Sequence, residues 1–313
     1  MNRRPFAALL ALISCLAGCG SSASHSQSAP LRRTRPHVLA TVRVGYQPCA
    51  LTEAQGAVWV TDYGSNQVVR IDPATNRVTR RIPVGTTPCG IAATAGDLWV
   101  ADVGAETMQR IDAATGRVTR EIPLGDQIWD VQAGYGSVWA TGRNNGVVYR
   151  IDPRQGRIVK RIHVGGRLSG LAAGAGGVWV AVQSKDEVRR IDPATDAITA
   201  TVRTRRAPVW FAVAGTQLWV SDQSAGVVQR IDPSTARITA TVHTGPGPLD
   251  LGLAGGSLWV PNSAGLLWRL GTGSPASITR SRWPAGIFVA QPAAGSLWLL
   301  DYGGYRVWRI SAS

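Results

Sequence analysis

The sequence predicts an all-β protein, a seven-bladed β-propeller, and three observations support this prediction. A tryptophan recurs seven times in phrases such as GDLWVAD, at intervals of 40 residues and lastly 39. The phrase Arg-Ile-Asp follows the first five of these tryptophans, and a strand-like N-terminal segment matches the piece that the last repeat lacks. Repeats of this length with four short strands each are propeller blades. The tryptophans are Trp59, Trp99, Trp139, Trp179, Trp219, Trp259 and Trp298.

Each repeat supplies four strands, as residues 88–125 illustrate with GIAAT, DLWVAD, TMQRID and RVTREIPL, named here from innermost to outermost. These stretches have strand length and are rich in Val, Ile, Thr or Trp. Between the third and fourth, segments such as IDPATNRV place Asp, Pro and Asn where a tight turn needs them. Asp196 and Ala236 replace the Gly or Asn and predict weaker turns. With four Glu and two Lys in the chain, helical repeats are disfavoured.

The seventh repeat contains only three strands, and the N-terminal segment is expected to complete it. Residues 38–45, VLATVRVG, match the outermost-strand phrase RVTRRIPVG of the first repeat. Pairing this segment with the last repeat would remove an open sheet edge. We therefore place the propeller at residues 37–313, with its last blade closed by the N-terminal strand.

The N-terminus carries an export signal. Residues 1–18 combine early arginines with a short apolar run that is too short to span a membrane. The run ends in LAGC, which resembles a bacterial lipobox and implies that Cys19 is lipidated after cleavage. An ordinary cleaved signal peptide is the alternative. Residues 19–36 are Ser-rich and predict a flexible tether. We expect a membrane-anchored lipoprotein on the extracytoplasmic side of the cell envelope, at either the inner or the outer membrane.

The formal net charge is +14, and nearly all of the cations are arginines. They are spread through the repeats, no nucleic-acid-binding motif is present, and an exported chain would rarely meet nucleic acid. We therefore expect no nucleic acid partner, a solvated basic surface and a monomer. Cys49 and Cys89 lie one repeat apart on neighbouring inner strands. In an oxidising compartment they could form a disulfide or remain two buried thiols.

The phrases PxGIA, LWVxD and VxRIDPxT resemble the YVTN/YncE-like and NHL-like propellers, and also the streptogramin B (virginiamycin B) lyases. That lyase family implies ring opening of a depsipeptide by elimination, with a histidine base and glutamate-held Mg²⁺. On this reading Mg²⁺ would be the cofactor. His163 and His243 fall on outer strands instead, so we expect no catalytic residue and no cofactor; a Mg²⁺-dependent lyase is the alternative. Metal ligands would then be Asp62, Asp102, Asp222 and Asp301, at the ends of second strands.

Propeller function usually lies at a channel mouth, so residues that depart from the repeat consensus there are the candidates. Small residues are expected at the start of each inner strand, yet Trp129, Asp130, Trp210 and Asp250 stand there. They predict a pocket with aromatic walls and orienting carboxylates that binds a small ligand or a protein partner. The alternative is that they plug the channel. Neighbouring second-strand ends add Arg143, Tyr63 and Tyr302 as ligand-binding candidates.

Overall fold

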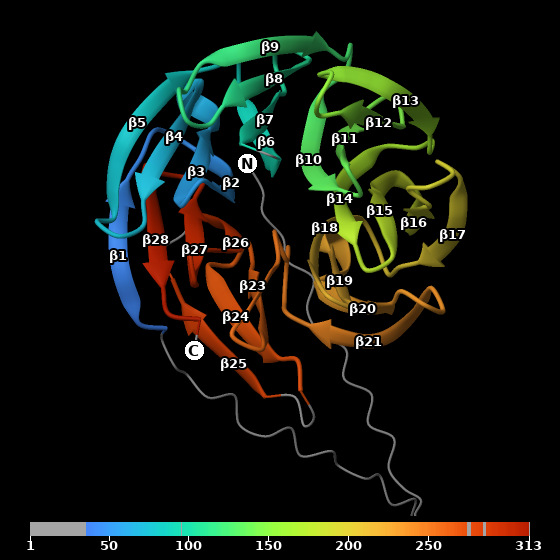
Figure 1. Ribbon diagram of the computed structural model, residues 1–313. Helices are drawn as coiled ribbons and strands as arrows, with labels where there is room; N and C mark the ends of the chain where they lie inside the picture. The colour runs from blue at the N-terminus through green and yellow to red at the C-terminus, as the bar shows by residue number, and fades with distance from the viewer. Residues whose placement is uncertain (1–35, 95, 274–276, 284–285, 313) are drawn as a thin grey trace, which may run out of the picture. The chain divides into compact units, whose positions relative to one another are not determined.

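The computed structural model describes residues 36–94, 96–273, 277–283 and 286–312. The predicted signal peptide, Cys19 and all but the last residue of the predicted tether lie outside these ranges. No helix within them is long and apolar enough to cross a membrane. The described chain forms seven four-stranded antiparallel sheets, each in contact with the next, and the seventh contacts the first (Figure 1). The predicted seven-bladed propeller is confirmed.

Six blades are built from consecutive strands, and the seventh takes its outermost strand from the N-terminus. From inner to outer strand, blade 1 is β2 (Pro48–Ala54), β3 (Ala57–Asp62), β4 (Gln67–Asp72), β5 (Arg77–Pro83); blade 2 is β6 (Pro88–Thr94), β7 (Asp97–Asp102), β8 (Thr107–Asp112), β9 (Val118–Pro123); blade 3 is β10 (Ile128–Gly134), β11 (Ser137–Gly142), β12 (Val147–Asp152), β13 (Arg157–His163); blade 4 is β14 (Leu168–Gly174), β15 (Gly177–Val182), β16 (Glu187–Ile191), β17 (Ile198–Arg203). Blade 5 is β18 (Pro208–Ala214), β19 (Gln217–Asp222), β20 (Val227–Asp232), β21 (Arg237–His243); blade 6 is β22 (Gly252–Ala254), β23 (Ser257–Pro261), β24 (Leu266–Gly271), β25 (Ile278–Arg282); blade 7 is β26 (Ile287–Ala293), β27 (Ser296–Asp301), β28 (Arg306–Ile310), β1 (Val38–Arg43).

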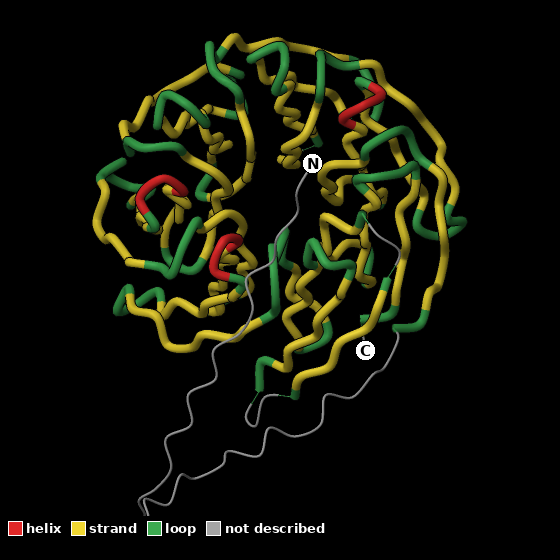
Figure 2. Tube along the Cα trace, turned by 180° about the vertical axis from the view of Figure 1, so that it is seen from behind, coloured by secondary structure: helices red, strands yellow, loops and turns green. Residues whose placement is uncertain are grey.

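Short 3₁₀ turns follow the second strand in three of the described blades (Figure 2). They are η1 (Tyr63–Ser65), η2 (Gln183–Lys185) and η3 (Gln223–Ala225). Each one ends at a residue in the left-handed conformation, which turns the chain back into the third strand. These turns sit at the same end of the blades as the starts of the inner strands.

The repeated tryptophan joins each blade to the next. Trp59 of blade 1 shares a core cluster with Ile91 and Leu98 of blade 2. Trp298 of blade 7 packs in the same way with Val58 of blade 1, so the contact runs around the whole ring. Losing a buried Trp in such a core costs about 3–5 kcal/mol. The repeated Trp is therefore the side chain that holds neighbouring blades together.

In blades 1 to 4, the arginine of the Arg-Ile-Asp phrase lies over the tryptophan of its own blade. The Arg150 guanidinium lies 5.0 Å from the ring of Trp139, and Arg70 lies 5.9 Å from that of Trp59. Arg150 also pairs with Asp196 of the next blade at 2.8 Å. These contacts give the phrase a structural role, because a cation over an aromatic face is attracted by the ring.

The N-terminal strand closes the last blade, as expected. β1 runs antiparallel to β28, with Val42 opposite Val307. Val42 and Val44 are buried and share a core cluster with Val69 of blade 1. The strand β1 therefore covers the edge of blade 7, and its valines pack in one core with blades 7 and 1.

Deleting residues 37–46 should lower the free energy of unfolding by at least about 3 kcal/mol, because two buried valines leave the core. The edge of β28 would also lose its hydrogen-bonding strand. Chemical denaturation of the variant and the parent measures the difference. Deleting residues 20–29 removes the same length of chain and no described strand, and should leave stability unchanged. A 37–46 deletion that unfolds like the parent would contradict the closure.

Candidate ligand-binding site in the central channel

The inner strands approach each other so closely that two channel positions have room only for glycine. A Cβ atom added to Gly90 would lie 2.9 Å from the backbone nitrogen of Val131 in the next blade. One added to Gly170 would lie 2.5 Å from the carbonyl oxygen of Val209. Larger side chains at equivalent positions must therefore point into the channel or cover its end.

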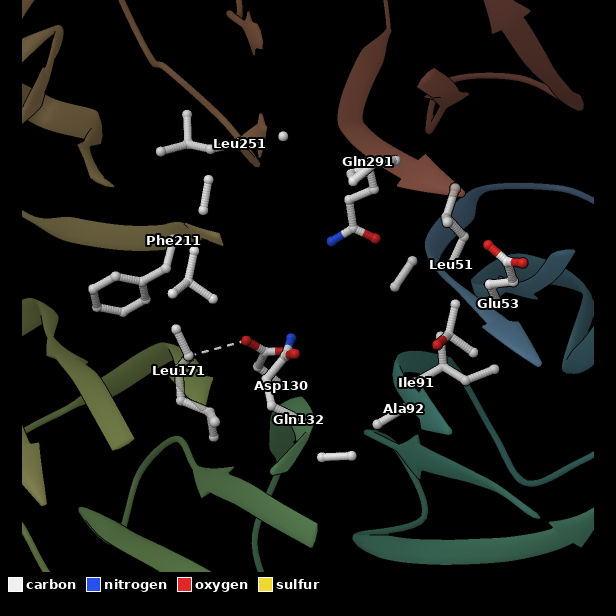
Figure 3. Close-up of a pocket in the computed structure, with 18 of the residues that line it drawn as sticks. Leu51, Glu53, Ile91, Ala92, Asp130, Gln132, Leu171, Phe211, Leu251 and Gln291 are labelled. Atoms are coloured by element: carbon white, nitrogen blue, oxygen red, sulfur yellow. Dashed lines mark hydrogen bonds between the residues drawn. The ribbon is translucent and has the colours of Figure 1, made fainter. Parts of the chain in front are cut away.

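A cavity of about 350 Å³ lies between the second halves of the inner strands (Figure 3). Its apolar walls include Leu51, Leu171 and Phe211, and its polar groups include Asp130 and Gln291. A much smaller space of about 30 Å³ lies between the first halves of the same strands. The two spaces are continuous in their lining, since both are bordered by Ala50, Asp130, Gln132, Leu171, Phe211 and Gln291.

Asp130 projects into the channel from blade 3 and bonds to two blades. Its Oδ1 accepts a hydrogen bond from the backbone N–H of Val131 at 2.8 Å, and its Oδ2 accepts one from Leu171 of blade 4 at 2.9 Å. Gln132 donates a longer bond of 3.4 Å to Oδ1. Burial raises the pKa of Asp130 to about 6, although these hydrogen bonds lower it. The carboxyl of Asp130 is thus buried among apolar residues and accepts backbone hydrogen bonds from Val131 and Leu171.

Asp250 belongs to blade 6 and borders the smaller space. Its Oδ1 accepts the backbone N–H of Leu251 and its Oδ2 accepts the side-chain amide of Gln291, each at 2.8 Å. Burial raises the pKa of Asp250 well above its usual range, and the charge of Asp130 raises it further. Neither carboxylate takes part in an ion pair within the described chain. The charge of Asp130 therefore raises the cost of ionising Asp250. Glu53 is a further acidic residue of the larger cavity's lining.

Aromatic rings cover the end of the channel where the inner strands begin. Trp129 stacks on Trp210 with ring centroids 6.3 Å apart, and Trp210 meets Phe288 edge to face at 6.0 Å. The series continues from Phe288 to Tyr302 at 5.2 Å and from Tyr302 to Tyr63 at 6.0 Å. The predicted aromatic residues do converge here, but they pack on one another. Their packing favours the alternative that they fill this end, and the larger cavity lies beyond them.

Arg143 completes this aromatic cover. Its guanidinium lies 4.1 Å from the ring centroid of Trp129. Burial lowers the pKa of Arg143, and the nearby charge of Arg167 lowers it further. Arg143 therefore packs on a face of the Trp129 ring. Among the described residues, no ion pair joins Arg143 to Asp130 or Asp250.

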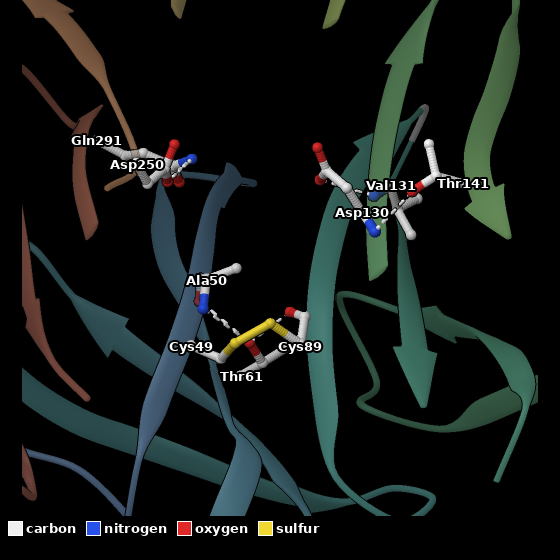
Figure 4. Close-up of a disulfide and its surroundings, with 9 residues drawn as sticks. All are labelled: Cys49, Ala50, Thr61, Cys89, Asp130, Val131, Thr141, Asp250 and Gln291. Carbon is white, nitrogen blue, oxygen red and sulfur yellow. Dashed lines mark hydrogen bonds between the residues drawn. A yellow bond between two sulfur atoms is a disulfide. The ribbon is translucent and has the colours of Figure 1, made fainter. Parts of the chain in front are cut away.

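A disulfide joins Cys49 to Cys89 at the same end of the channel (Figure 4). Their Cα atoms are 5.1 Å apart, within the range that a disulfide requires. Both cysteines are buried and pack with Trp129, Tyr63 and Tyr302. Of the two alternatives from the sequence, the structure contains the bridge, which ties β2 to β6 beneath the aromatic cover.

The four aspartates of the predicted metal set are not brought together. Each lies at the end of a second strand in a different blade. Asp62 and Asp222 bond to the loop before their own blade's inner strand, and Asp301 instead pairs with Arg306 at 3.5 Å. Asp62 accepts the backbone N–H of Gly45 at 2.7 Å, and Asp222 accepts that of Arg205 at 3.2 Å. Within the described ranges, no three acidic, His or Cys side chains are grouped to hold a metal. Burial raises the pKa of all four carboxyls, Asp62, Asp102, Asp222 and Asp301.

Glu53, Gln132 and Gln291 are polar channel residues that the sequence analysis missed. Gln132 lies two residues after Asp130, and Gln291 lies two residues after the equivalent Val289 of blade 7. Both glutamines face the cavity in Figure 3. The sequence repeat could have revealed these two glutamines, because the equivalent residues of the other blades have short side chains. Those residues are Thr52, Ala92, Ala172, Ala212 and Gly252.

Known proteins resemble this chain in part of its sequence and in its fold. Residues 83–181 match a family model described as a repeat of unknown function, DUF6923. No curated protein sequence matches the chain.

Solved structures match almost the whole chain at low identity. A streptogramin B lyase structure has a TM-score of 0.76 and 16% identity, over 89% of this chain and 97% of the other. The structure of U3-55K has a TM-score of 0.72 and 10% identity, over 90% and 97%. The Cps50 (Swd1) β-propeller domain of Myceliophteria thermophila has a TM-score of 0.77 and 12% identity, over 89% and 100%. The chain is therefore a seven-bladed β-propeller similar in fold to the streptogramin B lyase, and likeness at this identity shows the fold alone.

Proposed function

We propose that this protein is a lipid-anchored, extracytoplasmic propeller that binds a small, positively charged ligand in its central channel without catalysis. The observation that carries the proposal is the pair Asp130 and Asp250, which lies in the channel with no ion-pair partner among the described side chains. A cavity of about 350 Å³ suits a small organic molecule.

The chemistry of the lining indicates an ammonium group on an apolar body. A buried carboxylate is costly unless a cation or several hydrogen bonds compensate it, and a protonated amine would supply both. Gln132 and Gln291 add amide oxygens that could accept further N–H donors. Leu171 and Phe211 offer apolar contact for the rest of the ligand. The aromatic cover and the disulfide close the other end, so the ligand would enter beside the second halves of the inner strands.

A lyase of the streptogramin type is the second candidate, favoured by the fold likeness. The described histidines, His37, His163 and His243, are all exposed, and two of them lie on outer strands. Asp130, with a pKa of about 6, is the channel group best suited to accept a proton at neutral pH. Opening of a cyclic depsipeptide that is lost in Asp130→Asn would support this candidate over simple binding.

The binding proposal predicts selectivity for charge. Alkylammonium and arylammonium compounds should raise the melting temperature, while neutral alcohols and carboxylates of the same shape should not. Asp130→Asn and Asp250→Asn should each weaken amine binding roughly tenfold or more, because a charge-assisted hydrogen bond is lost. Calorimetric titration of each variant gives the affinities.

Asp62→Asn is the matched control, since Asp62 is equally buried and has a similarly raised pKa but lies outside the channel lining. It should bind amines like the parent. Equal binding of neutral analogues, or full affinity in the channel variants, would refute a cation site.

The anchoring part of the proposal rests on the LAGC phrase and predicts that Cys19→Ala abolishes both acyl labelling and membrane retention. Radiolabelled fatty acid and membrane fractionation of producing cells provide the measurement. A Cys15→Ala variant, which changes a cysteine upstream of the cleavage position, should remain labelled. Parent protein found wholly in the soluble fraction would show that the chain is not a lipoprotein.

A further inference from the structure

The outer strands of blades 1, 2 and 3 form a surface of concentrated positive charge, called here the basic arc. Glu121 is the one acidic side chain on β5, β9 and β13. The cations are all exposed. They are Arg77, Arg80 and Arg81 on β5, Arg117 and Arg120 on or beside β9, and Arg157, Lys160 and Arg161 on β13.

The charge is concentrated on one side of the ring. The outer strands of the other four blades carry fewer cations, which are Arg43, Arg203, Arg237, Arg280 and Arg282. Opposite the arginine of each Arg-Ile-Asp phrase, the outer strand places Arg80, Arg120 and Lys160 in blades 1 to 3. The same register position holds Ala200 in blade 4 and Ala240 in blade 5. Alanine in two blades shows that strand pairing at this position does not require a cation, although Arg80 also donates a hydrogen bond to the carbonyl oxygen of Ala114 at 2.9 Å.

The basic arc begins beside the point where the N-terminal segment joins the propeller. β1 is the outer strand of blade 7 and contacts β5. Figure 1 shows β1, β5, β9 and β13 following one another along the rim. A tether that ends at β1 would therefore hold the basic arc close to whatever surface anchors the other end of the tether.

We propose that the basic arc docks on an anionic phospholipid surface and sets the orientation of the propeller at the membrane. This inference rests on the proposed anchoring, not on the channel ligand. Basic clusters next to a membrane attachment are drawn to anionic headgroups, and the attraction acts over about a Debye length of ~8–10 Å at moderate salt. Because that range exceeds one side-chain length, cations on neighbouring strands of a curved rim act together. The arc follows the outer strands of three neighbouring blades.

The chain from residue 20 onward lacks the proposed lipidation site Cys19 and contains every strand of the closed ring. Its binding to vesicles therefore reports on the basic arc and not on the covalent lipid anchor. Vesicles of phosphatidylglycerol and phosphatidylcholine in equal parts are compared with pure phosphatidylcholine by co-sedimentation. We expect binding to the anionic vesicles only, and its loss in high salt. The triple change Arg80→Ala, Arg120→Ala and Lys160→Ala should weaken binding about 100-fold, from roughly fivefold per cation.

A matched control removes the same charge from the opposite side of the ring. Arg203→Ala, Arg237→Ala and Arg282→Ala lie on β17, β21 and β25 and should change vesicle binding only a few-fold. Equal losses in the two triples would show that net charge alone matters and would overturn the arc. No binding to anionic vesicles would overturn it as well. If the basic arc binds a soluble anionic polymer but not vesicles, the phospholipid proposal is overturned and the polymer is the partner. If the parent protein is not acylated in cells but still binds anionic vesicles, the proposed lipid anchor at Cys19 is overturned and the basic arc is not.

Discussion

The approach of seven inner strands to one axis is the constraint on which the rest of the structure depends. The repeated tryptophan holds each blade against the next, and β1 holds the last blade against the first. With the ring closed, Gly90 and Gly170 have no room for a side chain. Any larger group on an inner strand is forced toward the axis, so residues far apart in sequence, such as Asp130 and Asp250, meet in one channel.

Much of this architecture could be predicted because the repeat records it directly. The spacing of Trp59 and Trp99 counts blades, and the match of residues 38–45 to an outer strand reveals the closure. The same register correctly placed Cys49, Cys89 and the aromatic candidates at one end of the channel. Departures from a repeat are informative because the fold makes every blade position equivalent unless a local interaction is added.

Side-chain direction could not be predicted in the same way. Trp129 and Trp210 look like pocket walls when only their register is known, but their rings stack and close the end of the channel. Asp62 and Asp222 look like a metal set, yet each turns back to a loop of its own blade. The uneven distribution of charge was missed because arginines are frequent throughout the sequence, although the repeat register aligns Ala200 with Arg80, as the strand pairing shows.

The central claim is that the charge of Asp130 opposes the ionisation of Asp250 in the channel and that a cation would relieve this repulsion. The most direct measurement is a carboxyl-carbon NMR titration of Asp250 in the parent and in Asp130→Asn. The account predicts a raised pKa of Asp250 in the parent, and a lower one in the variant because a like charge is gone. Burial should keep the variant value above the usual 3.8. An ordinary pKa in the parent, or one unchanged by Asp130→Asn, would contradict the account.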